Sequence, residues 1–199
     1  IKIIITTNTK LSDLYKDGLQ REQFLPFISI IKNYSIQKEL SLKDDYRLKD
    51  LNEQQRLYYP LNESTLFMIN KNFRELTRDK KKEIKKINTK GRDFIISNFY
   101  DGILRFKFSD LCDKNLGAED YINISNISDH IFIEEIPIFN DDNSNQQLRF
   151  ITLIDILYEK KVILSLSLES DLNNLGSSRK HVQTFKRTIS RLIELTKKN

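Results

Sequence analysis

Two polar side chains near the start of the chain have types and positions suited to binding an anionic ligand. Asn8 directly follows the β-branched run over residues 3–7, and we expect residues 2–7 to form a buried strand. In open α/β sheets, ligands bind at the carboxyl ends of the strands. Asn8 would therefore present an amide where ligands bind, although asparagine is also a common turn residue that only caps a strand.

Arg21 opens a second element, a helix expected over residues 21–33. Phe24, Phe27, Ile28 and Ile31 have helical spacing there, and Pro26 must lie in the first turn or kink the helix. A permanently charged, planar guanidinium at a helix start can reach an oxyanion. The simpler alternative is a surface ion pair with Glu22 or Asp17.

Three other arginines are candidates for phosphate contacts. Arg187 and Arg191 are four residues apart in an amphipathic helix expected over residues 182–195, so they share one helix face. Arg47 follows Asp45-Tyr46, after a strand expected over residues 36–42. The alternative is that Arg187 and Arg191 are solvated, or that Arg191 pairs with Glu194.

The remaining pattern predicts an α/β fold, because strands and helices alternate. Asp101-Gly102 lies between two strand-like runs and predicts a hairpin. The lysines at 80–82, 85 and 86 are interpreted as the solvated end of a helix over residues 63–78. The alternative is that these lysines contact the surface of an anionic partner. Residues 140–147 are expected to form a loop. Further expected strands cover 93–99, 103–108, 130–136 and 162–168, and further expected helical segments lie near 12–19, 116–121 and 148–158.

Composition excludes several classes of protein. The chain has 199 residues and a net charge of +5, from 33 Lys and Arg against 28 Asp and Glu. This mild excess does not match a dedicated nucleic-acid binder, which needs its positive charge gathered on one face. The single cysteine, Cys112, allows no internal disulfide and reads as a small buried hydrophobe. No apolar run is long enough to span a membrane, and His130 and His181 show no metal-ligand spacing.

Six groups of residues, in order, make the chain resemble the C-terminal half of ZapE-type ATPases, which are AAA+-like P-loop proteins. They are Thr6-Thr7-Asn8; Leu14-Tyr15 with residues 18–21 and 24–28; Asp45-Tyr46-Arg47; Leu111-Cys112 with 116–118 and Asp120-Tyr121; 149–151 with 153–155 and 157–158; and Arg187 with 190–192 and Glu194. The resemblance implies that residues 1–57 are the C-terminal part of a P-loop ATPase core. Residues 58–199 would then form an α/β C-terminal region with a β-hairpin and a closing helix.

The phosphate-binding motif G-x-x-x-x-G-K-[ST] does not occur in the 199 residues, nor does an apolar strand ending in Asp-Glu. Because Ile1 already lies inside an expected strand, we expect the chain to be a piece of a longer protein. The resemblance implies that the missing N-terminal half holds ATP and Mg²⁺.

The resemblance also assigns roles to the arginines and to Asn8. Asn8 would sense the γ-phosphate or the attacking water, and Arg21 would act as an arginine finger on a neighbouring subunit, which implies a homo-oligomer. Arg187, Arg47 and Arg191 compete for a second phosphate-sensing position, with a slight preference for Arg187.

The implied function is ATP binding and hydrolysis by the full-length protein, with cell-division or protein quality-control proteins as partners. The expected location is the cytoplasm in a bacterium or the mitochondrion in a eukaryote. Two other functions stay open: a catalytically inactive protein-interaction module, and a weak nucleic-acid binder that rests only on the lysines and the basic pI.

Overall fold

The computed structural model describes residues 7, 9–16, 18, 20–36 and 56–197. The chain divides into two compact units, Ile1–Asp45 and Tyr46–Asn199, and each is described by itself. Asn8 and Arg47 lie outside the described residues, as do all but one residue of each of the strands expected over 2–7 and 36–42.

The first unit contains a short 3₁₀ helix, η1 (Leu11–Asp13), and α1 (Arg21–Tyr34). The expected helix start at Arg21 is confirmed. Pro26 lies in the second turn, where its ring nitrogen cannot donate the helical hydrogen bond to the carbonyl oxygen four residues earlier. Aromatic contacts stabilise the local packing, since the ring centroids of Tyr15 and Phe24 are 5.4 Å apart and those of Phe24 and Phe27 are 5.1 Å apart.

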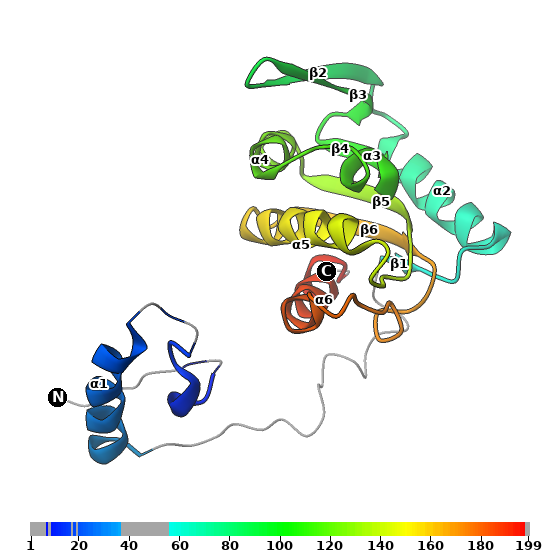
Figure 1. The fold of residues 1–199 in the computed structure, drawn as a ribbon. Helices are drawn as coiled ribbons and strands as arrows, with labels where there is room; N and C mark the ends of the chain where they lie inside the picture. The colour runs from blue at the N-terminus through cyan, green and yellow to red at the C-terminus, as the bar shows by residue number, and fades with distance from the viewer. Residues whose placement is uncertain (1–6, 8, 17, 19, 37–55, 198–199) are drawn as a thin grey trace. The chain divides into compact units, whose positions relative to one another are not determined.

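The second unit is built on a mixed sheet of six strands in the order β1-β6-β5-β4-β3-β2 (Figure 1). Four neighbouring strands, β1, β6, β5 and β4, are parallel, and β3 and β2 continue the sheet in antiparallel fashion. The α/β class expected from the alternation of elements is confirmed. The strands are β1 (Leu57–Tyr58), β2 (Glu83–Thr89), β3 (Arg92–Tyr100), β4 (Ile103–Lys107), β5 (His130–Ile136) and β6 (Ile163–Leu168).

Helices cover both faces of the parallel strands. One face carries α3 (Phe108–Cys112), α4 (Ala118–Ser125), α5 (Ser144–Glu159) and α6 (Val182–Leu195), and the other carries α2 (Glu63–Thr77) (Figure 1). Successive residues of β4 show the division, because Leu104 belongs to the larger core under α3–α6 and Ile103 to a smaller core under α2. Parallel sheets need this double cover, because their strands are apolar on both sides.

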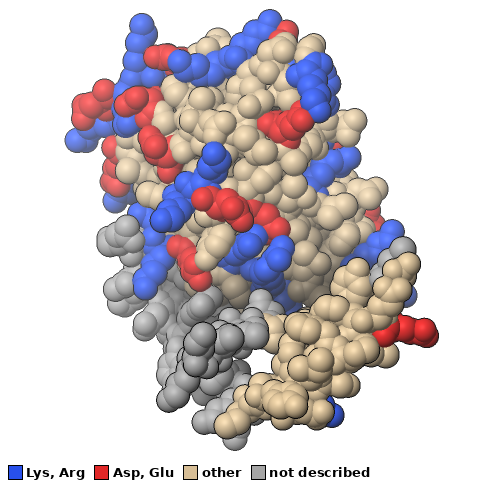
Figure 2. All heavy atoms as spheres, turned by 90° about the vertical axis from the view of Figure 1, so that its left-hand side faces the viewer, with Lys and Arg blue, Asp and Glu red and all other residues tan. Residues whose placement is uncertain are grey.

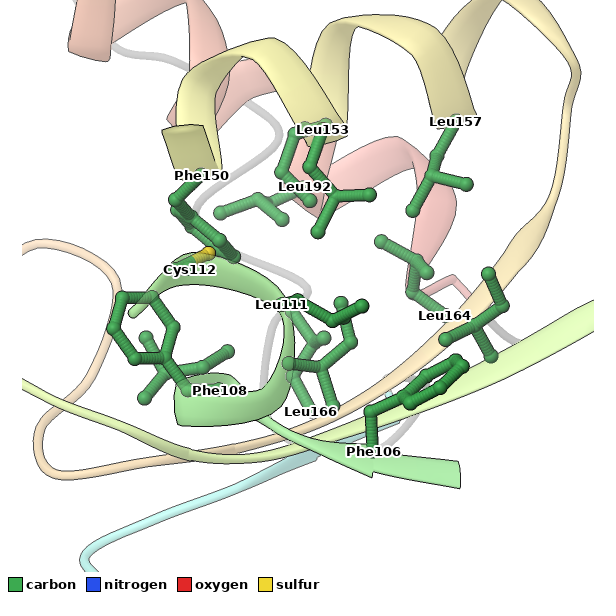
Figure 3. Close-up of a cluster of buried hydrophobic side chains, with 14 of the residues drawn as sticks. Phe106, Phe108, Leu111, Cys112, Phe150, Leu153, Leu157, Leu164, Leu166 and Leu192 are labelled. Atoms are coloured by element: carbon green, nitrogen blue, oxygen red, sulfur yellow. The ribbon is translucent and has the colours of Figure 1, made fainter. Parts of the chain in front are cut away.

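The larger core joins side chains from four helices and the sheet (Figure 3). Phe150 of α5 lies beside Phe108 and Cys112 of α3. Leu153 and Leu157 of α5 and Leu192 of α6 lie over the sheet strands that carry Phe106 and Leu164. The helix α6 has the bounds expected from its periodicity. The helix α5 begins four residues before the expected start at Leu148, so the second half of the expected loop over 140–147 is helical.

Two hairpins shape the antiparallel end of the sheet. The expected hairpin at Asp101-Gly102 is confirmed, with φ angles of 44° and 81° at its two central residues, as a type I′ turn requires. The second hairpin, between β2 and β3, turns at Lys90-Gly91 with φ angles of 50° and 81°.

The interpretation of the lysine cluster as a helix end was wrong for Lys85 and Lys86, whereas the lysines at 80–82 follow the end of α2. The helix α2 ends at Thr77, and Lys85 and Lys86 lie in β2, the edge strand of the sheet. Lysine-rich edge strands are common because the charge opposes pairing with other chains. Lys85 and Lys86 form ion pairs with Glu83 (2.9 Å) and Asp93 (2.7 Å) respectively.

The two turn glycines provide a matched test of this topology. Both Gly91 and Gly102 have positive φ, so alanine at either position should cost about 1–2 kcal/mol of stability from backbone strain. A Cβ at Gly91 meets nothing within 4 Å, whereas a Cβ at Gly102 would collide with the Asp129 carboxylate. Because this carboxylate ends an exposed side chain that can rotate aside, we expect Gly102→Ala to lower the free energy of unfolding, measured by urea denaturation, by up to about 1 kcal/mol more than Gly91→Ala. Equal losses would contradict the packing of the Asp101-Gly102 turn against Asp129.

Candidate functional site: two arginines around Asp155

A hollow of about 520 Å³ opens on the outer side of α5 and α6. Three basic and two acidic side chains line it, together with two isoleucines. The lining residues are Ile122, Asp155, Ile156, Glu159, Lys160, Arg187 and Arg191.

Asp155 of α5 holds both arginines of α6. Arg187 Nη2 donates to Asp155 Oδ2 at 2.9 Å, and Arg191 Nη1 donates to the other oxygen, Oδ1. The two arginines are one helical turn apart, so a single carboxylate on the facing helix can accept from both. Sequence reasoning placed Arg187 and Arg191 on one helix face but did not identify Asp155 as their common partner.

The two arginines differ in how far water and ligands can reach them. The Arg191 side chain is 18% exposed, and its guanidinium carbon lies 4.8 Å from the centroid of the Tyr158 ring. The Arg187 side chain is 56% exposed. Arg191 thus packs between Asp155 and Tyr158, while Arg187 keeps donor groups available to an anion in the hollow.

Arg21 belongs to the first unit and is not among the residues that line this hollow. Its Nη2 donates to the carbonyl oxygen of Ser12 at 2.9 Å. Its Nε is buried and has no hydrogen-bond partner among the residues that the structure describes. The alternative ion pair with Glu22 is not present between these two described residues, and Asp17, the other candidate partner, lies outside the described residues. The described contact that orients the side chain is the backbone oxygen of Ser12.

Several residues of the family-like groups hold α3, α4 and α5 together. Arg149 Nη1 donates to the carbonyl oxygen of Cys112 at 3.0 Å, and the Tyr121 hydroxyl donates to that of Leu111 at 2.9 Å. Asp120 accepts from the Gly117 amide at 2.8 Å and from Arg92 Nη2 at 3.0 Å. These bonds fix α5, and therefore Asp155, relative to the sheet.

The buried side chains of Cys112 and His130 are held in their neutral forms and pack in the core. Cys112 is fully buried, as expected, and burial raises the pKa of its thiol, which keeps it protonated and unreactive. Burial, with a smaller effect of Arg56, lowers the pKa of His130 to about 4, so this imidazole is neutral where it stacks on Phe132. Among the described ranges, no group of three or more His, Cys, Asp or Glu side chains is placed to hold a metal ion.

Charge on the surface is mixed in sign. Figure 2 shows Lys and Arg side chains interspersed with Asp and Glu over one face of the molecule. Lys80, Lys90 and Lys107, for example, pair with acidic side chains at 2.6–3.0 Å. None of the helices in the described segments is long and apolar enough to cross a membrane.

The two ion pairs of Asp155, with Arg187 and with Arg191, should contribute unequally to stability. Removing Arg191 takes away a mostly buried partner of Asp155 and its contact with Tyr158, so Arg191→Gln should cost about 2 kcal/mol in the free energy of unfolding. Arg187→Gln removes an exposed ion pair and should cost less than about 1 kcal/mol. Chemical denaturation of both variants tests this, and an equal or reversed order would contradict the assignment of Arg191 as the packed arginine.

Comparison with known proteins places the chain in a family. It is 32% identical over 178 residues to lactation elevated protein 1 homolog B of Danio rerio, covering 88% of this chain and 35% of that protein. It is 28% identical over 195 residues to the cell division protein ZapE of Escherichia coli K12, covering 98% and 52%, and 28% identical to an uncharacterized protein of Schizosaccharomyces pombe, covering 100% and 50%. No solved structure matches the chain significantly. The family model for AFG1-like ATPases matches residues 1–199, and the chain therefore belongs to the AFG1-like ATPase family.

Proposed function

We propose that this chain is the C-terminal portion of an ATP-hydrolysing, AAA+-like ATPase, and that it supplies arginines to a nucleotide site completed by other residues. The observation that carries the proposal is the family match over the whole chain. The chain spans about a third to a half of the length of the curated relatives described above. In this proposal, residues 1–57 complete the ATPase core and residues 58–199 form the C-terminal region.

Arg187 is the residue of the second unit best suited to contact a phosphate. Its guanidinium is exposed at the hollow but held by the Asp155 carboxylate, so it is oriented before a ligand arrives, and pre-orientation reduces the entropy lost on binding. Arg191 supports it by occupying the second oxygen of Asp155. Arg47 remains a competing candidate for the same role.

The nucleotide and its metal ion would be held mainly outside this chain, since the chain has no phosphate-binding loop. When bound, Mg²⁺ would neutralise the negative charge that develops on the β- and γ-phosphates during hydrolysis. The described residues fit this division, because they offer exposed guanidinium donors and no carboxylate cluster for a metal.

Arg21 is proposed as the arginine finger that acts on the nucleotide of a neighbouring subunit, and Asn8 as the residue that senses the γ-phosphate. The hydrogen bond from Arg21 Nη2 to the Ser12 carbonyl orients the guanidinium, and among the residues that the structure describes no hydrogen bond occupies Nη1, the nitrogen proposed to reach the partner subunit's nucleotide. A finger requires that the complete protein form a homo-oligomer, because the finger and the nucleotide it serves belong to different subunits.

Arg21→Ala in the complete protein should lower ATP turnover by about 10³-fold or more while ATP binding persists. The matched control is Lys32→Ala, which removes a positive charge from the last turn of the same helix and should leave turnover unchanged. Turnover is measured by phosphate release and binding by titration with a fluorescent ATP analogue. Wild-type turnover in Arg21→Ala would eliminate the finger assignment, and turnover by the 199-residue chain alone would show that the nucleotide site does not need other residues.

Arg187→Ala in the complete protein should weaken nucleotide affinity by about tenfold, the equivalent of one charge-assisted hydrogen bond. Arg179→Ala is the control, because Arg179 is also an exposed arginine paired with an aspartate, Asp141, but does not line the hollow. Unchanged affinity in Arg187→Ala, with normal affinity in the control, would transfer the role to Arg47.

The partners and location of the complete protein are also proposals. The name of the E. coli relative links it to cell division, and on that basis we propose division or protein quality-control proteins as partners, with a cytoplasmic location if the protein is bacterial.

A further inference from the structure

A second hollow, of about 490 Å³, lies on the α2 side of the sheet, opposite the face that carries α5 and α6. It opens between α2 and the strands β3 and β4. The lining residues are Asn70, Phe73, Arg74, Asn98, Tyr100 and Arg105. Neither the family resemblance nor the proposed nucleotide site uses any of these residues.

One residue, Asn70, holds both arginines of this hollow. Its side-chain Oδ1 accepts from Arg105 Nη2 at 2.6 Å, and its backbone oxygen accepts from Arg74 Nε at 3.3 Å. Arg105 also lies over the ring of Phe73, with its guanidinium carbon 4.8 Å from the ring centroid. The two guanidinium groups are therefore anchored at one end and directed to the same space.

Several donors at this hollow have no acceptor among the residues that the structure describes. Among the residues that the structure describes, only Arg105 Nη2 and Arg74 Nε are engaged in hydrogen bonds, which leaves two nitrogens on each guanidinium. The Asn98 amide and the Tyr100 hydroxyl are likewise without a hydrogen bond in this part of the chain. Since the Arg105 side chain is only 20% exposed, a ligand that accepted from it would gain a well-shielded, charge-assisted bond.

The charge and shape of the hollow narrow the class of ligand. Glu134 contacts Arg105 Nη2 from the core side and offsets one positive charge, although its own burial raises the pKa of its carboxyl group. Arg74 has no acidic partner among the described residues, so the hollow carries about one net positive charge. The half-buried ring of Tyr100, which meets the buried ring of Phe73 edge to face at 5.4 Å, supplies an apolar wall beside the donors.

We propose that this hollow binds a carboxylate carried on an apolar or aromatic body, with the Arg74 and Arg105 guanidinium groups on the carboxylate and the Tyr100 ring against the body. A planar guanidinium fork matches a planar carboxylate, and one net positive charge suits a monoanion. The volume lies within the range of pockets that hold small organic ligands. The carboxylate belongs either to a free small acid or to the C-terminal residue of a peptide, since both present the same chemistry.

The test uses the 199-residue chain and N-acetylphenylalanine as the probe, followed by NMR or calorimetry. The uncharged N-acetylphenylalaninamide is the matched ligand control. We expect saturable binding of the acid and at least about tenfold weaker binding of the amide. Equal binding of the two probes, or no binding of the acid, would overturn the proposal.

Variants assign the binding to this hollow. Arg74→Gln should weaken binding of the acid by about tenfold, while Arg78→Gln, which removes the same charge from the exposed C-cap of the same helix, should not. Arg105→Lys keeps a positive charge beside Glu134 but loses the planar guanidinium, so it should weaken binding of the acid. The melting temperature of this variant is measured in parallel to check that it folds. If Arg74→Gln binds as well as Arg78→Gln, the hollow is not the site.

A final comparison separates the two sources of the carboxylate. A pentapeptide that ends in phenylalanine with a free carboxylate is titrated beside N-acetylphenylalanine. Tighter binding of the peptide, lost in Arg74→Gln, supports recognition of a chain terminus; equal or weaker binding supports a free small acid. Inorganic phosphate that competes as well as the acid would contradict the assignment of a planar carboxylate.

Discussion

The arrangement of the second unit depends on covering the central parallel strand, β5, on both faces. Residues His130 to Glu134 of this strand are all buried, and parallel strands of this kind are stable only when helices exclude water from each side. The helices α5 and α6 cover one face, and α2 covers the other. This single requirement creates two layers of helix and two separate hollows at their margins.

Each hollow has the same physical design, a pair of arginines held by one residue of a neighbouring turn or helix. At the first hollow the shared partner is the Asp155 carboxylate, and at the second it is Asn70, which uses its side-chain and backbone oxygens. In each pair one arginine is largely buried and stacks on an aromatic ring: Arg191 on Tyr158, and Arg105 on Phe73. The other arginine, Arg187 or Arg74, stays exposed and is the one available to a ligand.

The two hollows differ in the number and position of the acidic side chains that balance their arginines. Asp155 and Glu159 both line the first hollow, and their negative charges would repel a highly charged anion. Most protein contacts of a polyphosphate would therefore have to come from residues outside this hollow. That agrees with the proposal that Arg187 contributes one phosphate contact to a site built by other residues. At the second hollow, Glu134 lies behind Arg105 in the core, and the lining itself contains no acid.

Sequence patterns alone predicted most elements of the second unit and the resemblance to the family. Helical spacing predicted the start of α1 at Arg21 and both ends of α6, and Asp101-Gly102 predicted the turn between β3 and β4, because these signals lie within a few neighbouring residues. The edge strand β2 was missed because Lys85 and Lys86 obscure its alternation, and only pairing with β3 shows it. The common partner of Arg187 and Arg191 could not be predicted, because Asp155 is more than thirty residues away and meets them only through helix packing. Tertiary structure alone decided which arginine of each pair is buried, since burial depends on the rings and carboxylates that distant segments bring to it.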